Sequence, residues 1–372
     1  MTTSQPDILV IGAGIAGASV AAELARTHEV LLLEAEDAPG YHSTGRSAAV
    51  FSESYGNRAI RALTRASRDF FHRPPAGFSD YPLIKRRGWL HVASASQASA
   101  LEGFLATEDV GPRVRRVSRD EALALSPLLR PQTAALGGAY EPDAADIDVH
   151  ALHQGYLRLL RRDGTLLTRA RVTAATRDGA DWRILSTAGE FRAPVVINAA
   201  GAWADPIAKL AGIRPKRIQP CRRTAVLVEV SDEEISDAWP LTIDIQEGYY
   251  FKPDAGLLLV SPADETPVEP MDAQPQELDV ATAVDRLERA TRVSVKRVRR
   301  AWAGLRSFSP DRSPVIGFDA DAPGFFWLAG QGGYGIQTAP AAADLAATLV
   351  RGDPPPEGLT GFDAACVAPG RF

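Results

Sequence analysis

The chain has 372 residues, of which 45% are hydrophobic and 23% are charged, and its formal net charge at pH 7 is -5. This length allows a full hydrophobic core and about two domains. Nucleic acid and anionic membranes attract proteins through a basic field, so the negative charge argues against both partners and favours small-molecule chemistry.

The two cysteines, Cys221 and Cys366, lie far apart and outside any CxxC spacing, which predicts neither a disulfide framework nor a zinc site. The N-terminus has no basic segment followed by a long apolar run, and no stretch reaches the roughly 18 apolar residues of a membrane span. We therefore expect no targeting or transmembrane segment and a cytoplasmic location.

The first elements predict a right-handed βαβ unit. Residues 7–12 (DILVIG) and 29–34 (EVLLLE) are continuous apolar runs, typical of strands that are covered on both faces in a parallel sheet. Between them, residues 14–26 have the Ala- and Leu-rich composition of a helix.

Further helices are expected before residue 165. An apolar pattern covers roughly residues 57–72, and another helix is expected from about Asp148 to Arg162, ending at Gly164. The sequence SRDE at 118–121 is a capping box, which satisfies free amides at the start of a helix.

Beyond residue 165 short strands predominate. TLLT, RVTAATRD, DWRILST and EFRA precede the apolar run PVVINAAG, which is expected to return to the parallel sheet and to lead into a helix at 202–212. Residues 216–262 and 293–308 predict a mainly antiparallel sheet, with one helix near 279–290. The sequence from 325 on predicts a strand, a Gly-rich turn and a helix, and DPPPEG at 353–358 indicates a surface break before a loose tail.

The sequence GAGIAG matches the GxGxxG pattern of dinucleotide-binding units. Gly12 allows the tight turn, Gly14 lets a pyrophosphate approach the backbone, and Gly17 lets the helix pack closely. The start of that helix would direct its amides at the phosphates. Glu34, at the end of the next strand, would accept hydrogen bonds from a ribose and repel a 2′-phosphate, which disfavours NADP. The alternative is a merely solvated carboxylate.

Two Gly- and Ser-rich segments, 43–49 (STGRSAA) and 328–338 (LAGQGGYGIQT), favour FAD over NAD. No His stands in an obvious catalytic setting for a nicotinamide dehydrogenase. The flavin ring needs backbone that approaches without bulky side chains, and the positive pole of the last helix would stabilise the reduced ring. The alternative is that each segment is only a turn. The expected contacts are Ser43, Thr44, Arg46, Ser47, Ala48, Gly332, Gly333, Tyr334, Gly335, Ile336, Gln337 and Thr338.

A single GxGxxG gives no second nucleotide site for NADH, so the organic substrate itself is expected to reduce the flavin.

The motifs DILVIGAGIAGAS, PGYHSTGRSAA, ADIDVHALHQGYLR, NAAGAWAD, KPDAG, AWAGLRSF and LAGQGGYGIQT follow in one order from about residue 7 to 350. Together they resemble the D-amino-acid oxidase and glycine oxidase superfamily of FAD-dependent oxidoreductases, most closely the bacterial FAD-dependent D-arginine dehydrogenases. The resemblance implies oxidation of a D-amino acid to the imino acid, which water hydrolyses to the 2-oxo acid and ammonia. It adds Ala16, Ala35, Val172, Ala200 and Gly201 to the expected FAD contacts.

The expected fold class is α/β plus α+β. A Rossmann-like FAD-binding domain, formed by residues 1–80, 145–210 and 305–365, would be interrupted by a mainly antiparallel substrate-binding domain at 81–144 and 211–304.

The same resemblance assigns the substrate site. Arg223 and Arg306 would clamp the substrate carboxylate, since a planar guanidinium binds a carboxylate at two points. Tyr250 would add a hydroxyl to that end, Tyr55 would close over the substrate, and the Gly333 carbonyl would hold the amine. The alternatives are a structural ion pair for Arg306 and a solvated strand position for Arg223. Because no base is obvious, the amine would react in its neutral form and activity would rise with pH.

Two departures from D-arginine dehydrogenases bear on the substrate. Trp89 stands where they carry a Glu for the guanidinium, and Val50 stands where they carry a His. A buried guanidinium needs an acidic partner, so we expect apolar or aromatic D-amino acids to be preferred. Asp244 or Glu247 would be the residues able to restore an acidic contact, and the alternative for Trp89 is simple core packing.

Relatives that bind FAD covalently do so through a Cys near the segment AWAGLRSF, which has none here, so noncovalent FAD is expected. His150 and His153 have helical spacing but no third ligand, so no metal site is expected. The alternatives to a D-amino-acid dehydrogenase are an oxygen-using D-amino-acid or secondary-amine oxidase, a D-arginine dehydrogenase proper, and a noncatalytic flavin-binding subunit. The sequence does not specify the electron acceptor.

Overall fold

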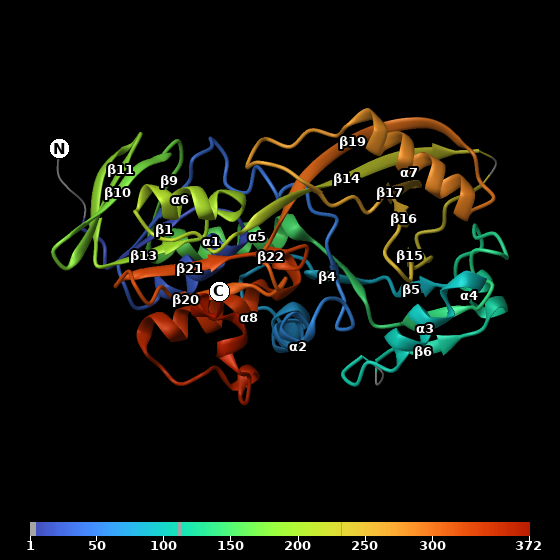
Figure 1. Cartoon of the computed structure of the whole chain (residues 1–372), viewed down its shortest axis with the longest axis horizontal. Coiled ribbons are helices and arrows are strands. Elements are labelled where there is room, and N and C mark those ends of the chain that lie inside the picture. The colour runs from blue at the N-terminus through green and yellow to red at the C-terminus, as the bar shows by residue number, and fades with distance from the viewer. Residues whose placement is uncertain (1–4, 111–112, 232) are drawn as a thin grey trace.

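The structure, a computed structural model, describes residues 5–110, 113–231 and 233–372 and contains two large sheets (Figure 1). In the six-stranded sheet all neighbouring strands run parallel except one antiparallel pair at its edge, β20 with β21. In spatial order its strands are β20 (Val315–Phe318), β21 (Phe325–Ala329), β13 (Val195–Asn198), β1 (Ile8–Ile11), β2 (Val30–Leu33) and β9 (Thr165–Leu167).

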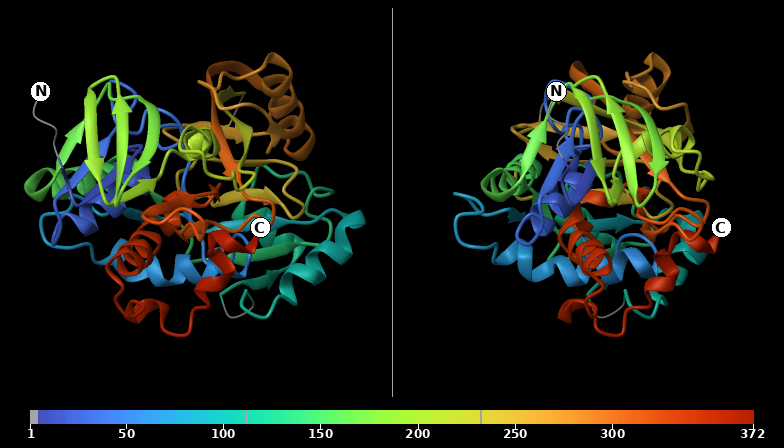
Figure 2. Two further views of the ribbon diagram at one scale, coloured as in Figure 1. Left: turned by 60° about the vertical axis from the view of Figure 1, so that its left-hand side comes forward. Right: turned by 90° about the vertical axis from the view of Figure 1, so that its left-hand side faces the viewer.

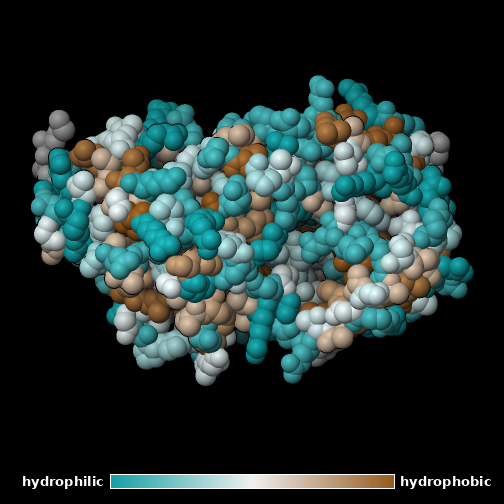
Figure 3. Space-filling view, viewed as in Figure 1, coloured by the Kyte–Doolittle hydropathy of each residue, from teal (hydrophilic) through white to brown (hydrophobic). Residues whose placement is uncertain are grey.

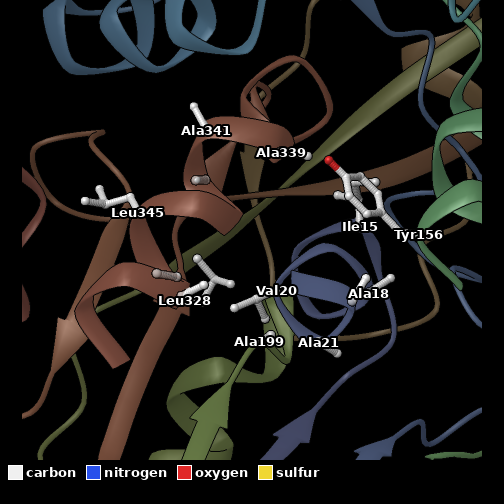
Figure 4. Packing of buried hydrophobic residues seen from close by; sticks show 14 of the residues in the cluster. Ile15, Ala18, Val20, Ala21, Tyr156, Ala199, Leu328, Ala339, Ala341 and Leu345 are labelled. Atoms are coloured by element: carbon white, nitrogen blue, oxygen red, sulfur yellow. The ribbon is translucent and has the colours of Figure 1, made fainter. Parts of the chain in front are cut away.

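Both faces of this sheet are covered, which explains the continuous apolar runs in β1 and β2. Alternate residues of a strand point to opposite faces, so Ile8 and Val10 pack against helices while Leu9 and Ile11 pack on the other side. The helices are α1 (Ile15–Leu24), α2 (Arg58–His72), α5 (Val149–Asp163) and α8 (Gly335–Arg351), and Figure 4 shows part of this packing. The other face carries α6 (Ala204–Leu210) and the antiparallel sheet of β10 (Val172–Asp178), β11 (Asp181–Ser186) and β12 (Gly189–Ala193), seen in Figure 2.

The second large sheet has ten strands, and only its β15–β5 pair is parallel. Its path is β22 (Gln331–Gly332), β19 (Val295–Phe308), β14 (Gln219–Val230), β17 (Leu257–Ser261), β16 (Tyr250–Asp254), β15 (Leu241–Asp244), β5 (Trp89–Val92), β7 (Gly138–Glu141) and β6 (Arg115–Val117), and β18 (Thr266–Pro267) pairs with β14. Helix α7 (Glu277–Ala290) packs on one face through Ala283 and Leu287. The other face carries the apolar residues of the candidate site.

Shorter elements complete the chain. A three-stranded sheet forms where the chain passes between the two large sheets. Its strands are β3 (Val50–Phe51), β8 (Ala145–Ile147) and β4 (Ile84–Arg86). The remaining helices are α3 (Ala98–Leu105), α4 (Arg119–Leu125), and the 3-10 helices η1 (Ala95–Gln97), η2 (Gly201–Trp203), η3 (Glu357–Leu359), η4 (Ala364–Val367) and η5 (Pro369–Arg371).

The expected fold class is confirmed: a Rossmann-like parallel sheet is combined with a large, mainly antiparallel one. The helices expected at 57–72 and 148–162 and the capping box of Ser118 and Glu121 are confirmed as well. The strand expected at TLLT is present as β9, which extends the parallel sheet beside β2. One expectation is wrong: the tail is not loose, because Val367 is fully buried against the helical layer.

Among the described residues no helix is long and apolar enough to cross a membrane. On the face seen in Figure 3, hydrophilic residues predominate and hydrophobic ones are scattered.

Candidate active site

A cavity of about 380 Å³ is lined by residues of both sheets and by the two Gly-rich segments. The structure brings most of the expected site residues to its wall. They are Gly12, Gly14, Ala16, Glu34, Ala35, Ser43, Thr44, Arg46, Ser47, Ala48, Val50, Tyr55, Trp89, Val172, Ala200, Gly201, Arg223, Tyr250, Arg306, Gly332, Gly333, Gly335, Ile336 and Gln337. Gly17, Tyr334 and Thr338 are not among the residues that line it.

Two glycines where the chain passes from β1 into α1 have no room for a side chain. Gly12 has a φ of 99°, a conformation that favours glycine, and a Cβ there would lie 2.7 Å from the Ala199 carbonyl oxygen. A Cβ on Gly17 would lie 1.8 Å from the Gly12 carbonyl oxygen, so Gly17 lets α1 pack on the loop. At the helix start, the amide of Ile15 donates to Thr44 Oγ1 at 3.0 Å.

Glu34 lies at the end of β2 and is 8% exposed. Its Oε2 accepts from the amide of Ala13 at 2.8 Å, and its Oε1 accepts from the amide of Glu36 at 2.9 Å. The carboxylate is therefore not a solvated surface group but is fixed at the cavity wall by two backbone donors. Each oxygen keeps a lone pair for a ligand hydroxyl.

His153 supports the same loop from α5. Its Nε2 lies 2.9 Å from the carbonyl oxygen of Ala13, and burial lowers the pKa of the imidazole, which keeps the ring neutral. Among the described residues no group of three or more potential metal ligands is found. His153 thus has a structural role beneath the GxGxxG turn.

Residues 40–50 are fixed against the antiparallel sheet. Ser43 donates to the carbonyl of Leu305 at 2.7 Å, and Arg46 forms an ion pair with Asp272. The polar ends of these side chains are therefore occupied by protein groups, and they position the segment along the cavity.

The residues present fit FAD. The cavity wall includes the fixed carboxylate of Glu34, the glycines that follow β1, Gly332 and Gly333, and Gly304 on β19. Small residues on both sides leave backbone exposed to a flat ring. Neither cysteine belongs to this wall.

Arg306 also lines the cavity, next to Tyr55 and Gly333. Its Nη1 donates to the Tyr55 hydroxyl at 3.2 Å, and a Cβ on Gly333 would lie only 2.7 Å from this Nη1. No ion pair to Arg306 is found in the described part of the chain, so the structural ion pair considered from the sequence is absent there. Burial raises the pKa of Tyr55, although the Arg306 charge opposes this effect. The hydroxyl therefore stays protonated at neutral pH.

Arg223 differs from Arg306 in its partners. It is 8% exposed, which rules out the solvated strand position. Its Nε donates to the carbonyl of Asp264 at 2.7 Å, and its Nη2 pairs with Glu265 at 2.9 Å. Glu265 also pairs with Arg312 at 3.0 Å. Arg223 thus has a carboxylate partner, which it shares with Arg312, whereas Arg306 has none among the described residues.

Trp89, on β5, lies in an apolar cluster with Leu241, Ile243 and Tyr250 and also lines the cavity. Its ring lies 5.0 Å from that of Tyr55, centroid to centroid. Trp89 therefore packs in the apolar core and also borders the cavity. Val50 belongs to the same cluster.

Asp244 is not available to a substrate. Its oxygens accept from Gln97 Nε2 at 2.7 Å and from the amide of Gly248 at 3.1 Å, and it does not line the cavity. Glu247 does line the cavity.

Leu241, Ile243 and Gly304 also line the cavity, although they were not among the expected site residues. Strand pairing identifies these residues, because Leu241 pairs with Trp89, and Gly304 pairs with Arg223. Paired residues project to the same face of a sheet. The sequence alone does not give this pairing.

The family model described as "FAD dependent oxidoreductase" (DAO) matches residues 7–349. Similar curated proteins include the glycine oxidase of Geobacillus kaustophilus, 24% identical over 94% of this chain and 93% of that protein. The hydrogen cyanide synthase subunit HcnC of Pseudomonas aeruginosa is 25% identical over 98% of this chain and 96% of its own. The tRNA-modifying bifunctional protein MnmC of Burkholderia multivorans is 27% identical over 98% of this chain, which spans only 59% of that protein.

Solved structures of similar fold include the L-proline dehydrogenase of P. horikoshii, with a TM-score of 0.84 and 20% identity over 100% of this chain and 98% of that one. The G. kaustophilus glycine oxidase has a TM-score of 0.82 and 22% identity, and each chain is covered completely. The iminodiacetate oxidase of Chelativorans sp. BNC1 has a TM-score of 0.79 and 22% identity over 97% and 98% of the two chains. At these identities the similarity shows a common fold.

Proposed function

Because the chain belongs to the DAO family of FAD-dependent oxidoreductases, we propose that it is a dehydrogenase that oxidatively deaminates D-amino acids with apolar or aromatic side chains. FAD is its cofactor. In this proposal residues 1–80, 145–210 and 305–365 form the FAD-binding domain, and residues 81–144 and 211–304 form the substrate-binding domain.

The proposal depends on the observation that Arg306 lines the cavity without an anionic partner among the described residues. A guanidinium enclosed by protein requires an anionic or strongly hydrogen-bonding partner, and Tyr55 supplies only one neutral oxygen. The α-carboxylate of an amino acid would complete the guanidinium fork at two points. Tyr250, on the same wall, would contribute its hydroxyl to this end, and the Gly333 carbonyl would accept from the amine.

FAD, when bound, supplies a two-electron oxidant. The amino acid loses its Cα hydrogen with two electrons and one proton from nitrogen, and it becomes an imino acid. Water then converts the imino acid to the 2-oxo acid and ammonia. The role of the protein is to hold the carboxylate, to orient the Cα hydrogen and to keep bulk water away from the reacting carbon.

No side chain is assigned as a base. The raised pKa of Tyr55 keeps its hydroxyl neutral, so it donates or accepts a hydrogen bond but does not remove a proton at neutral pH. The amine must then enter unprotonated, and the rate of flavin reduction should rise with pH along the titration of the substrate amine.

The named relatives support a carboxylate-bearing substrate. Glycine, L-proline and iminodiacetate all carry a carboxylate beside the carbon that is bonded to nitrogen. Glycine and iminodiacetate have no stereocentre and proline is the L-form, so the choice of D-amino acids depends only on the motif resemblance to D-arginine dehydrogenases. Trp89 and Val50 favour apolar side chains, whereas Glu247 on the cavity wall would be an acidic partner for D-arginine, so the test below includes both substrate types.

Anaerobic flavin reduction tests the proposal. The holoprotein is mixed with D- and L-forms of leucine, phenylalanine, methionine and arginine and with N-methylated glycines, and bleaching of the oxidised flavin is recorded. Reduction by the apolar D-amino acids, at least tenfold faster than by D-arginine, is the expected result. Preference for L-amino acids, secondary amines or D-arginine would replace the substrate class. If no amine bleaches the oxidised flavin, the protein would be a noncatalytic flavin-binding subunit.

Arg306→Gln provides the matched variant. It should retain FAD and its colour but lose about 30-fold or more in kcat/KM, the usual cost of removing one member of a buried charge pair. An unchanged kcat/KM would remove Arg306 from the site. Oxygen consumption compared with reduction of an artificial dye then distinguishes an oxidase from a dehydrogenase.

A further inference from the structure

The Tyr55 loop, residues 52–57 between β3 and α2, contacts a buried carboxylate of the ten-stranded sheet. This carboxylate belongs to Glu141 on β7, which is 2% exposed. Its Oε2 accepts from the hydroxyls of Ser52 at 2.6 Å and Ser54 at 2.5 Å, and its Oε1 accepts from the amide of Glu53 at 2.8 Å. All three donors thus come from the Tyr55 loop.

The carboxylate of Glu141 depends on these donors. Burial raises its pKa, and the hydrogen bonds from Ser52, Ser54 and Glu53 oppose this rise. A buried carboxylate without donors is strongly unfavourable. Any conformation in which the Tyr55 loop leaves Glu141 would carry this penalty, so Glu141 favours a single arrangement of the loop.

The side chain of Glu53 adds a second, more exposed set of contacts to the same loop. It pairs with Arg113 at 2.6 Å and with Arg68, and these arginine side chains are 41% and 36% exposed. Water and salt weaken ion pairs that reach the surface, so these pairs are expected to contribute less than fully buried hydrogen bonds. The contacts of Glu141 therefore dominate in fixing the middle of the Tyr55 loop.

Tyr55 directly follows the three donors. Its ring packs against those of Trp89 and Tyr334, with centroids 5.0 Å and 4.7 Å away, and its hydroxyl accepts from Arg306 Nη1 at 3.2 Å. Trp89 and Glu141 are paired residues of β5 and β7, so one strand pair contacts both the donors of the loop and the Tyr55 ring. A shift of the loop away from Glu141 would therefore move Tyr55 relative to Arg306.

We propose that Glu141 is a positioning residue, whose carboxylate holds the Tyr55 loop so that the Tyr55 hydroxyl lies at Arg306 before a substrate binds. Glu141 is not among the residues that line the cavity, so it acts through Tyr55 and not by contact with substrate or FAD. The inference rests on the proposed function, because that function places Tyr55 and Arg306 in the substrate site.

The position of the Tyr55 ring is measured without any substrate. The holoprotein, which has eight tyrosines, is labelled with ¹³C in the tyrosine rings, and the Tyr55 resonance is identified by its absence in Tyr55→Phe. Glu141→Gln keeps the size of the side chain but replaces one acceptor oxygen with a donor. In this variant the Tyr55 resonance should move or split, because the ring shifts relative to Trp89 and Tyr334.

Asp319→Asn is the matched control. Asp319 is also a buried carboxylate, 5% exposed, and it accepts from Trp327 Nε1 at 2.9 Å and pairs with Lys216 at 2.9 Å. It directly follows β20, at the edge of the other large sheet. This variant should lose stability and yet keep the Tyr55 resonance at its wild-type position. A Tyr55 resonance that is unchanged in Glu141→Gln, or displaced equally in Asp319→Asn, would overturn the proposal.

A double-mutant cycle then tests whether Glu141 acts through Tyr55. With the amino acid that reduces the flavin fastest, kcat/KM should fall at least fivefold in Glu141→Gln. The same substitution added to Tyr55→Ala should lower it further by no more than twofold. Equal falls in both backgrounds would show that Glu141 does not act through Tyr55.

The two measurements separate this inference from the proposed function. Failure of every amino acid to reduce the flavin would refute the proposed function, whereas the Tyr55 resonance would still report on Glu141. If Glu141→Gln does not yield folded holoprotein, the double variant Ser52→Ala/Ser54→Ala removes both hydroxyl donors from the loop side. It should displace the Tyr55 resonance in the same way, and a wild-type resonance there would refute the positioning role.

Discussion

The guanidinium of Arg306 occupies the space that a side chain at position 333 would need. A Cβ on Gly333 would lie 2.7 Å from Nη1, 2.8 Å from Cζ and 2.9 Å from Nε of Arg306, all closer than van der Waals contact allows. The glycine turn before α8 therefore fixes one side of the guanidinium, and the Tyr55 hydroxyl contacts it at 3.2 Å. Both contacts hold Arg306 at the cavity.

Gly333→Ala should displace the guanidinium and lower kcat/KM by about 10- to 100-fold, since small displacements of a positioning group reduce rates by this order. The variant should still bind FAD, because the added methyl group meets Arg306. Flavin absorbance and anaerobic reduction measure the two properties separately.

Gly103→Ala is the matched control. Nothing lies within 4 Å of a Cβ on Gly103, which lies in α3. This variant should keep wild-type kinetics and stability, or gain slightly in stability, because alanine favours a helix. Wild-type kinetics in Gly333→Ala would show that the substrate does not depend on the position of Arg306.

Glu265→Gln asks whether Arg223 also binds the substrate carboxylate. In the structure Glu265 pairs with Arg223 at 2.9 Å and also with Arg312, so a substrate carboxylate that binds Arg223 must compete with Glu265. If Arg223 belongs to the clamp, removing the competing charge should lower KM about 2- to 10-fold with little change in kcat. Glu269→Gln, an exposed carboxylate on the same segment, serves as control. An unchanged or higher KM in Glu265→Gln would mean that Arg223 is structural.

The parallel sheet could be predicted because its strands are covered on both faces. Burial on both sides makes β1 and β2 continuously apolar, and the glycines that follow β1 have a local conformational cause. The strands of 84–92 and 138–147 went unrecognised because they are short, and their pairing with distant segments such as β15 supplies most of their stability. The local periodicity of a sequence does not predict pairing between distant strands.

The site, too, has a part that could be predicted from the sequence and a part that could not. The cavity-lining residues of the Gly-rich segments are contiguous in sequence, so resemblance and spacing identified them together. The partners of individual side chains are not contiguous. The pairing of Arg223 with Glu265 depends on the position of the segment between β17 and β18, which no motif encodes.

Glu34→Gln should weaken FAD binding. Each carboxylate oxygen accepts from a backbone amide, that of Ala13 or that of Glu36. The side-chain amide nitrogen of Gln is a donor, so it leaves one of these backbone N–H groups unpaired. The loss destabilises the loop that holds the dinucleotide by about 1–3 kcal/mol. Titration of the apoprotein with FAD should show a Kd raised by about tenfold or more. Glu29→Gln, at an exposed position, should titrate like wild type, and a wild-type Kd for Glu34→Gln would refute the binding role.

His91 should make the fold sensitive to acid. Its imidazole is 5% exposed between Trp89 and Phe104, and burial lowers its pKa to about 3 from an ordinary value of 6.5. On acidification the unfolded chain takes up this proton first, so the free energy of unfolding falls as the pH drops below about 6.5 and stops falling near 3. At pH 5 this loss amounts to about 2 kcal/mol. Urea denaturation of the holoprotein at pH 7.5 and 5 should show that His91→Leu avoids this part of the loss. His72→Leu, which removes an exposed imidazole, should follow wild type, and parallel losses in wild type and His91→Leu would show that His91 does not govern acid stability.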